Sequence, residues 1–218
     1  MAADLLTDFQ RLVLRAFFRQ DGTEVFYLTG GAALAGYHLG HRATNDLNLF
    51  SSSADPTLGR EALEAAARDL GATVEDLRTS PDFRRTLVRR GDETVVVDLV
   101  RERAAQRVVA KPVVDGIPVD PPEEILANKV CTLLSRCEVR DLVDVMFLER
   151  SGLRVEDAVE SASRKDGGLT PGQLAWVLSQ ITFGEDARVP GGVTVGEVRA
   201  YALDLVARLS RLAFPRKR

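Results

Sequence analysis

Residues 26–50 read FYLTGGAALAGYHLGHRATNDLNLF and contain the motifs on which the fold prediction depends. The stretch begins as a short strand and turns at Gly30 and Gly31. An alanine-rich segment suited to a helix follows at 31–38, and residues 45–50 alternate polar and apolar side chains, the period of a strand with one wet face. This order predicts an α/β unit with a site along its second strand.

The second strand places two polar side chains together. Residues i and i+2 of a strand project to the same face, so Asp46 and Asn48 point together while Leu47 and Leu49 point to the opposite face. A two-carboxylate version of this pattern commonly holds magnesium, which prefers hard oxygen ligands. Asp46 is therefore a candidate metal ligand, with Asn48 beside it.

A third polar residue interrupts an apolar run. Residues 83–90 and 93–100 flank Gly91-Asp92 and are predicted to form a hairpin, in which Asp98 is the one acid among valines and leucines. Burying such a charge costs several kcal/mol, roughly, unless it is paired or binds metal. Asp98 completes a cluster if its strand lies beside 45–50. The alternative is an ion pair with an arginine such as Arg84, Arg85 or Arg101.

The glycine pair and the basic residue that follows suit an anion. A strand that ends in Gly30 and Gly31 before a helix lets backbone N–H groups approach a phosphate. Arg42, between this turn and Asp46, is a candidate phosphate contact, whereas His41 is interpreted as a polar loop or core histidine.

The remaining sequence predicts an α+β protein. Residues 3–19 and 57–70 have helical spacing, and prolines near 118–122 precede an almost entirely helical back half. We expect a core at 1–117 and a helical domain at 118–218. The helices predicted there are 122–136, 139–150, 154–164, 171–182 and 194–212.

Composition restricts the class of function. A net charge of −3 gives nucleic-acid binding no global support, so any such contact needs a local patch. The N-terminus mixes charges into its apolar positions and is not a signal peptide, and no apolar run has the length of a membrane span, so we expect a cytoplasmic protein. Cys131 and Cys137 form no metal-binding motif.

Two predicted helices of the back half carry candidate polar residues. Lys129, one of only four lysines, is by itself interpreted as a solvated-face residue. Asp141 and Asp144 share a face of the next helix. They either pair with Arg136 or Arg140, or orient substrate.

These residues resemble a known family. LTGGAALAGYHLGHRATNDLNLF resembles the first motif of the AbiEii/AbiGii-type nucleotidyltransferase toxins, including the MenT-type toxins, with its glycine turn, His-Arg pair and acidic strand. Asp98 resembles the family's third acid, and PPEEILANKVCTLLSRCEVRDLVDVMFL resembles its later helical region. The resemblance covers about residues 26–149.

The resemblance implies a polymerase-β-like core with a mixed sheet, Mg²⁺ or Mn²⁺ as cofactor, and transfer of a nucleotide from an NTP to RNA, above all the tRNA 3′ end. It also implies a cognate antitoxin as partner. The implied catalytic residues are Asp46, Lys129 and Asp141, the metal ligands are Asp46, Asn48 and Asp98, and the nucleotide contacts are Gly30, Gly31, Arg42 and Lys129.

Position 48 departs from the family pattern, which expects aspartate there. Asparagine offers one neutral oxygen but no charge to offset two metal ions, so we expect weaker metal binding and a lower rate. Natural degeneration, a tolerated variant and an inactivating substitution all explain it. The alternatives are a non-catalytic module that binds nucleotide or a partner, and a small-molecule nucleotidyltransferase with the same core.

Overall fold

The computed structural model describes residues 5–184 and 187–215. The chain divides into two compact units, Met1–Arg103 with Val108–Pro121, and Ala104–Arg107 with Pro122–Arg218. Among the described residues, no helix is both long and apolar enough to cross a bilayer.

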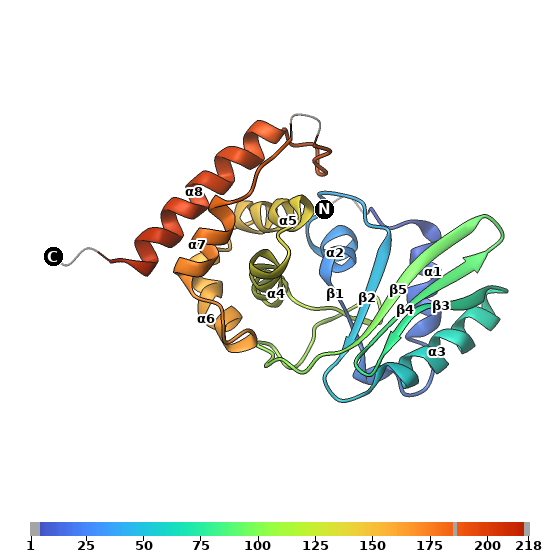
Figure 1. Cartoon of the computed structure of the whole chain (residues 1–218). Coiled ribbons are helices and arrows are strands. Elements are labelled where there is room, and N and C mark those ends of the chain that lie inside the picture. The colour runs from blue at the N-terminus through green and yellow to red at the C-terminus, as the bar shows by residue number, and fades with distance from the viewer. Residues whose placement is uncertain (1–4, 185–186, 216–218) are drawn as a thin grey trace. The chain divides into compact units, whose positions relative to one another are not determined.

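The first unit is built on a five-stranded mixed sheet (Figure 1). Its strand order is β1-β2-β5-β4-β3, in which β2 and β5 run parallel and the other neighbours are antiparallel. The predicted hairpin is present as β4 and β5. The bounds are β1 Tyr27–Thr29, β2 Asp46–Ser51, β3 Thr73–Ser80, β4 Phe83–Arg90 and β5 Glu93–Arg101, with a separate pair β6 Val113–Val114 and β7 Ile117–Pro118.

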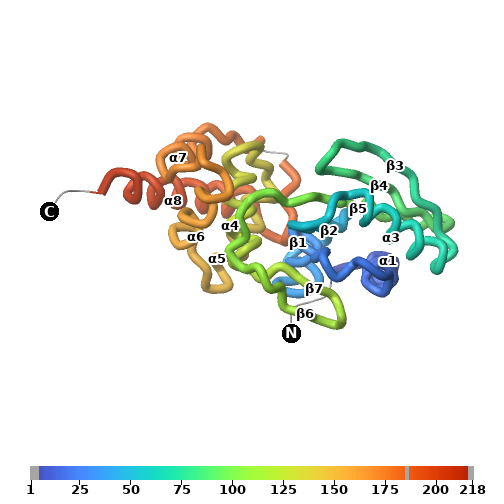
Figure 2. Tube along the Cα trace, turned by 90° about the horizontal axis from the view of Figure 1, so that it is seen from below, coloured from blue at the N-terminus to red at the C-terminus, as the bar shows by residue number. Residues whose placement is uncertain are grey.

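Two helices, α1 (Asp8–Phe17) and α3 (Pro56–Asp69), pack against one face of this sheet, as Figures 1 and 2 show. The core lies between these two helices and the sheet, because alternate strand residues such as Leu47 and Leu99 are fully buried there. Gly59 of α3 permits the close approach, since a Cβ atom there would lie 2.9 Å from Leu99. The opposite face of the sheet is left for the polar residues of the same strands.

Two local predictions for this unit need correction, and one strand has no counterpart among the predictions. The first helix begins at Asp8, not at residue 3, because Thr7 and Gln10 form a capping box; residues 3–4 lie outside the described residues. The helix expected at 31–38 is a short α-helix, α2 (Gly30–Ala33), that continues as a π-helical turn, η2 (Leu34–His38). Strand β3 was not predicted. A 3₁₀ turn, η1, occupies Thr23–Val25.

The second unit contains the helices predicted for the back half (Figure 1). Thr170 and Thr194 cap two of them by accepting a hydrogen bond from a backbone N–H group of the first turn. Helix α4 contacts α5, α6 and α7, and α7 packs along α8. The bounds are α4 Pro122–Ser135, α5 Val139–Arg150, α6 Val155–Lys165, α7 Pro171–Ser179 and α8 Val195–Ala213.

A polar network joins three helices of the second unit. Arg208 of α8 donates to Glu149 of α5 at 2.6 Å and to Glu156 of α6 at 2.9 Å, and the Tyr201 hydroxyl donates to Glu149 at 2.6 Å. Burial acts to raise the pKa of Glu149, but the hydrogen bonds from Arg208, Tyr201 and the Val155 N–H outweigh it, so this pKa lies below its ordinary value.

We expect Glu149→Gln to flatten the acid dependence of stability. A folded-state pKa below the unfolded-state value means that the carboxylate stabilises the fold above the unfolded-state pKa, and that this contribution is lost as the pH falls through the folded-state pKa. The variant should therefore have a smaller free energy of unfolding at pH 7 and a shallower decline from about pH 5 downward. Urea unfolding at a series of pH values measures this.

The matched control is Glu160→Gln, whose carboxylate makes an exposed pair with Arg164. It should leave the acid limb of the stability curve unchanged. Superimposable acid limbs for Glu149→Gln and the parent chain would contradict the assignment.

Candidate active site

Four polar residues on one face of the sheet come from three neighbouring strands and form what is called the row below. They are Asp46 and Asn48 of β2, Asp98 of β5 and Arg85 of β4. In the observed register, Asn48 of β2 is the partner of Asp98 of β5, and Asp98 is the partner of Arg85 of β4. Because Leu99 points toward α3, Asp98 points to the opposite face of the sheet. Asp46 lies two residues before Asn48 on the same face. The structure thus places the three predicted metal ligands on neighbouring strands and adds an arginine to them.

Asp98 is buried and forms a bidentate ion pair. Arg85 donates from Nε to Oδ1 at 2.8 Å and from Nη2 to Oδ2 at 2.7 Å, and the Asp98 side chain is 7% exposed. The hydrogen bonds to Asp98 raise the pKa of Arg85; burial opposes this, and the charges of Asp98 and Asp46 add to it. One of the arginines considered from the sequence therefore pairs with Asp98, within the electrostatic reach of Asp46.

Asp46 is half-buried and is oriented from the preceding loop. The Thr44 hydroxyl donates to Asp46 Oδ1 at 2.8 Å, and the buried Gln10 side chain of α1 donates to the Thr44 carbonyl at 2.8 Å. Gln10 also accepts from the Thr7 N–H as part of the helix cap. No local sequence pattern indicates this link, because a glutamine on a helix face is usually solvated.

The glycine turn lies against the same residues. Gly30 has φ +66°, and a Cβ atom on it would lie 3.3 Å from the Asn48 side chain. A Cβ atom on Gly31 would lie 3.1 Å from the Arg42 guanidinium and 3.2 Å from the Thr44 hydroxyl. Side chains at either position would fill the space beside Asn48 and Arg42, so the turn requires glycine for both conformation and close approach.

A buried carboxylate fixes the ends of this turn. Asp120 accepts from the Thr29 hydroxyl at 2.6 Å and pairs with Lys111 Nζ at 2.7 Å. The His38 ring contacts the Asp120 carbonyl oxygen at 2.7 Å. Asp120 thus holds residues on both sides of the glycine turn. The sequence predicts no such role for Asp120, which lies among the prolines near 118–122.

The candidate residues of the helical unit form a compact charged cluster. Lys129 Nζ of α4 lies 2.7 Å from Asp141 and 2.6 Å from Asp144, both on α5 and both fully buried. Arg136 also pairs with Asp141, at 3.1 Å, whereas Arg140 pairs with Glu138. Lys129 is buried, so the expectation that it is a solvated-face residue is wrong. The predicted pairing with Arg136 is present for Asp141, whereas Asp144 pairs with Lys129.

The donor set of the sheet suits one hard divalent cation. Two carboxylates and an amide oxygen are the ligand types that magnesium takes together with water and substrate phosphates. No group of three or more His, Cys, Asp and Glu side chains placed to hold a metal occurs within residues 5–184 and 187–215. The row itself offers two carboxylates, Asp46 and Asp98, and the neutral amide of Asn48.

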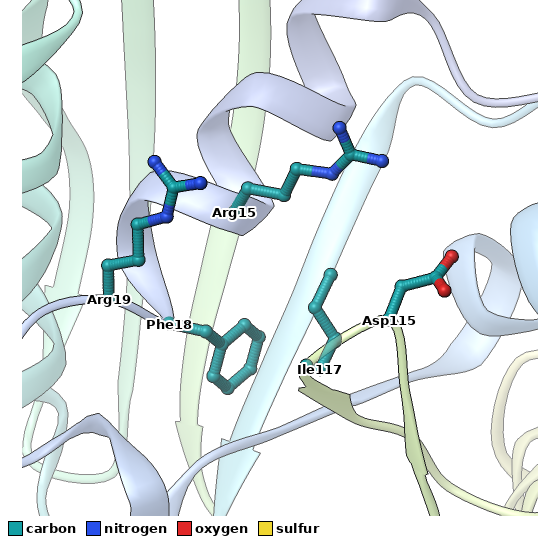
Figure 3. Close-up of a pocket in the computed structure, with 6 residues that line it drawn as sticks. Arg15, Phe18, Arg19, Asp115 and Ile117 are labelled. Carbon is teal, nitrogen blue, oxygen red and sulfur yellow. The ribbon is translucent and has the colours of Figure 1, made fainter.

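A separate pocket of about 460 Å³ lies between the end of α1 and the β6–β7 turn (Figure 3). It is lined by Arg15, Phe18, Arg19, Asp115, Gly116 and Ile117. None of the predicted site residues lines this pocket, so it is distinct from the row on β2, β5 and β4.

Comparison with known proteins identifies the family. Residues 11–189 match the model of the nucleotidyl transferase AbiEii toxin family of type IV toxin–antitoxin systems. The chain belongs to this family. No curated protein sequence is significantly similar to it. The AbiEii match spans the acid strand, the glycine turn and the lysine-bearing helix, so the predicted resemblance is confirmed.

Two solved structures from Helicobacter pylori share the fold of this AbiEii protein. One is JHP933, with 21% identity, a TM-score of 0.54, and coverage of 94% of this chain and 91% of that chain. The other is described as a "putative nucleotidyltransferase", with 19% identity, a TM-score of 0.57, and coverage of 95% and 99%. The predicted α+β class, a nucleotidyltransferase core on a mixed sheet followed by a helical half, is confirmed.

Proposed function

We propose that this AbiEii-family nucleotidyltransferase transfers a nucleotide from an NTP to the 3′ end of tRNA, as the toxin whose effect a cognate antitoxin counteracts. The observation that carries the proposal is the row on β2, β5 and β4, with Asp46, Asn48 and Asp98 beside a glycine turn. Transfer of this kind depends on positioning and electrostatics more than on covalent chemistry by the protein.

Each residue group has a role in the proposal. The backbone of Gly30 and Gly31 and the guanidinium of Arg42 hold the phosphates, because the turn brings them next to Asn48. Asp46, fixed by the Thr44 hydroxyl, and Asp98 present oxygens for a divalent cation, which when bound would offset the charge of the phosphates. Lys129 and Asp141 belong to the helical unit, where they contribute to triphosphate binding or to the stability of α4 and α5.

The test is transfer of label from each of the four NTPs to total tRNA, with the parent chain and Asn48→Asp. We expect labelled tRNA with both, and a rate about 10- to 100-fold higher for Asn48→Asp, because the added carboxylate strengthens cation binding. Aspartate is isosteric with asparagine and fits beside Gly30, so the fold should not change.

tRNA whose 3′ ribose has been oxidised by periodate is the acceptor control, since it lacks the vicinal hydroxyls. Labelling that survives oxidation would exclude the 3′ end as acceptor. If neither protein labels any RNA, the RNA proposal fails. Tight NTP binding without turnover, even in Asn48→Asp, would instead support the non-catalytic module that Asn48 suggests.

A further inference from the structure

Arg85 places a permanent positive charge inside the acid site. Its guanidinium makes two hydrogen bonds to Asp98, and the charge of Asp46 also acts on it. A guanidinium does not lose its proton at any pH at which the protein folds. Within the row, the Arg85 guanidinium thus opposes part of the charge that Asp46 and Asp98 present to a cation.

The register shows how Asp98 is flanked. On β4 its partner is Arg85, and on β2 its partner is Asn48, so one neighbour is a cation and the other a neutral amide. Neither supplies a second carboxylate directly opposite Asp98. The other acid of the row, Asp46, is the partner of Val96, one step along the same face.

The ion pair also limits what Asp98 can bind. Each of its oxygens accepts one hydrogen bond from Arg85, and the side chain is almost completely buried. Lone pairs remain on both oxygens, but a divalent cation there would lie close to the guanidinium and would be repelled by it. The Arg85 side chain is 44% exposed, so it has room to move away from Asp98.

We propose that Arg85 competes with a divalent metal ion for Asp98 and, together with Asn48, limits the acid site to one metal ion. This inference rests on the proposed function for the identity of the site, but its physical content is a competition between cations. Arg85 is then a positioning residue that sets the metal affinity of the acid pair.

Manganese titration followed by electron paramagnetic resonance tests this without nucleotide or RNA. We expect one Mn²⁺ per chain that depends on Asp46, and at least about tenfold tighter binding in Arg85→Gln, because a repelling charge is removed. Arg84→Gln is the matched control. Arg84 is the preceding residue of β4 and pairs with Asp76 instead, so its removal should leave the affinity unchanged.

Three further variants test the role of Asp98, the number of ions bound and the role of the bidentate geometry. Adding Asp98→Asn to Arg85→Gln should cancel the gain in affinity, and Asn48→Asp with Arg85→Gln should bind two ions. Arg85→Lys keeps the charge but loses the bidentate geometry and should show a smaller gain. Arg85→Lys provides the test of competition if circular dichroism shows that Arg85→Gln is unfolded.

Unchanged or weaker Mn²⁺ binding in Arg85→Gln, no Asp46-dependent binding in any variant, or two such ions in the parent chain would each overturn the proposal. The Mn²⁺ titration gives its result independently of RNA labelling. Tighter Mn²⁺ binding in Arg85→Gln without any labelled RNA would support the competition and refute the proposed function.

Discussion

Asp46→Asn is expected to lower the rate of nucleotide transfer by about 100- to 1000-fold, the size of effect seen when one preorganised electrostatic group is removed from an active site. Asp46 is the carboxylate of the row that Arg85 does not hold in a bidentate pair, and the Thr44 hydroxyl fixes its orientation. Asparagine still accepts that hydrogen bond, so the change removes the charge and preserves the local geometry.

The rate should be measured with labelled NTP and tRNA in two backgrounds, the parent chain and Asn48→Asp, so that the loss is visible against the higher rate. Asp92→Asn, in the exposed β4–β5 turn of the same sheet, removes an equal charge and should have no effect. Asp46→Asn variants that retain more than about a tenth of the rate would place the acid function elsewhere.

Lys129→Met is expected to destabilise the helical unit by about 3–5 kcal/mol, because it leaves the buried carboxylates of Asp141 and Asp144 without this ammonium group. Arg136 offsets only part of the loss, since it contacts Asp141 from a half-exposed position. Thermal unfolding should show a fall in Tm of at least about 10 °C.

A triple variant separates stability from nucleotide binding. Lys129→Met with Asp141→Asn and Asp144→Asn removes the buried charges together and should recover much of the lost stability. If Lys129 also contacts the triphosphate, the triple variant will fold but bind NTP more weakly than the parent chain. The control Arg164→Met breaks an exposed pair and should cost about 0–1 kcal/mol. A Lys129→Met protein as stable as this control would contradict the buried cluster.

Elements with a strong apolar period were predictable from the sequence. The hairpin of β4 and β5 follows from two alternating stretches around Gly91-Asp92, and the back-half helices follow from their spacing and caps. Strand β3 was missed because it lies at the sheet edge, where nearly all its side chains are exposed and no apolar alternation is required. The start of α1 was missed because the cap at Thr7 outweighs the apolar pattern before it.

The candidate site was predictable only where one segment carries the signal. Asp46, Asn48 and the glycine turn occur within 19 residues, and Asp98 stands out as a charge in an apolar strand. The choice of Arg85 among several arginines depends on strand register, which local sequence does not determine. The contacts of Gln10 with Thr44 and of Lys111 with Asp120 likewise join distant segments and have no local pattern.

The edge strand β3 has a consequence for association between molecules. An outer strand exposes backbone N–H and C=O groups that can pair with another chain and start aggregation. Here Glu75, Asp76 and Arg78 line that edge strand, and the register shifts between Asp76 and Arg78, so a second strand would meet charges and an irregular backbone. The opposite edge is covered, since Leu28 of β1 bridges to Val119. The two edges resist intermolecular strand addition by different means.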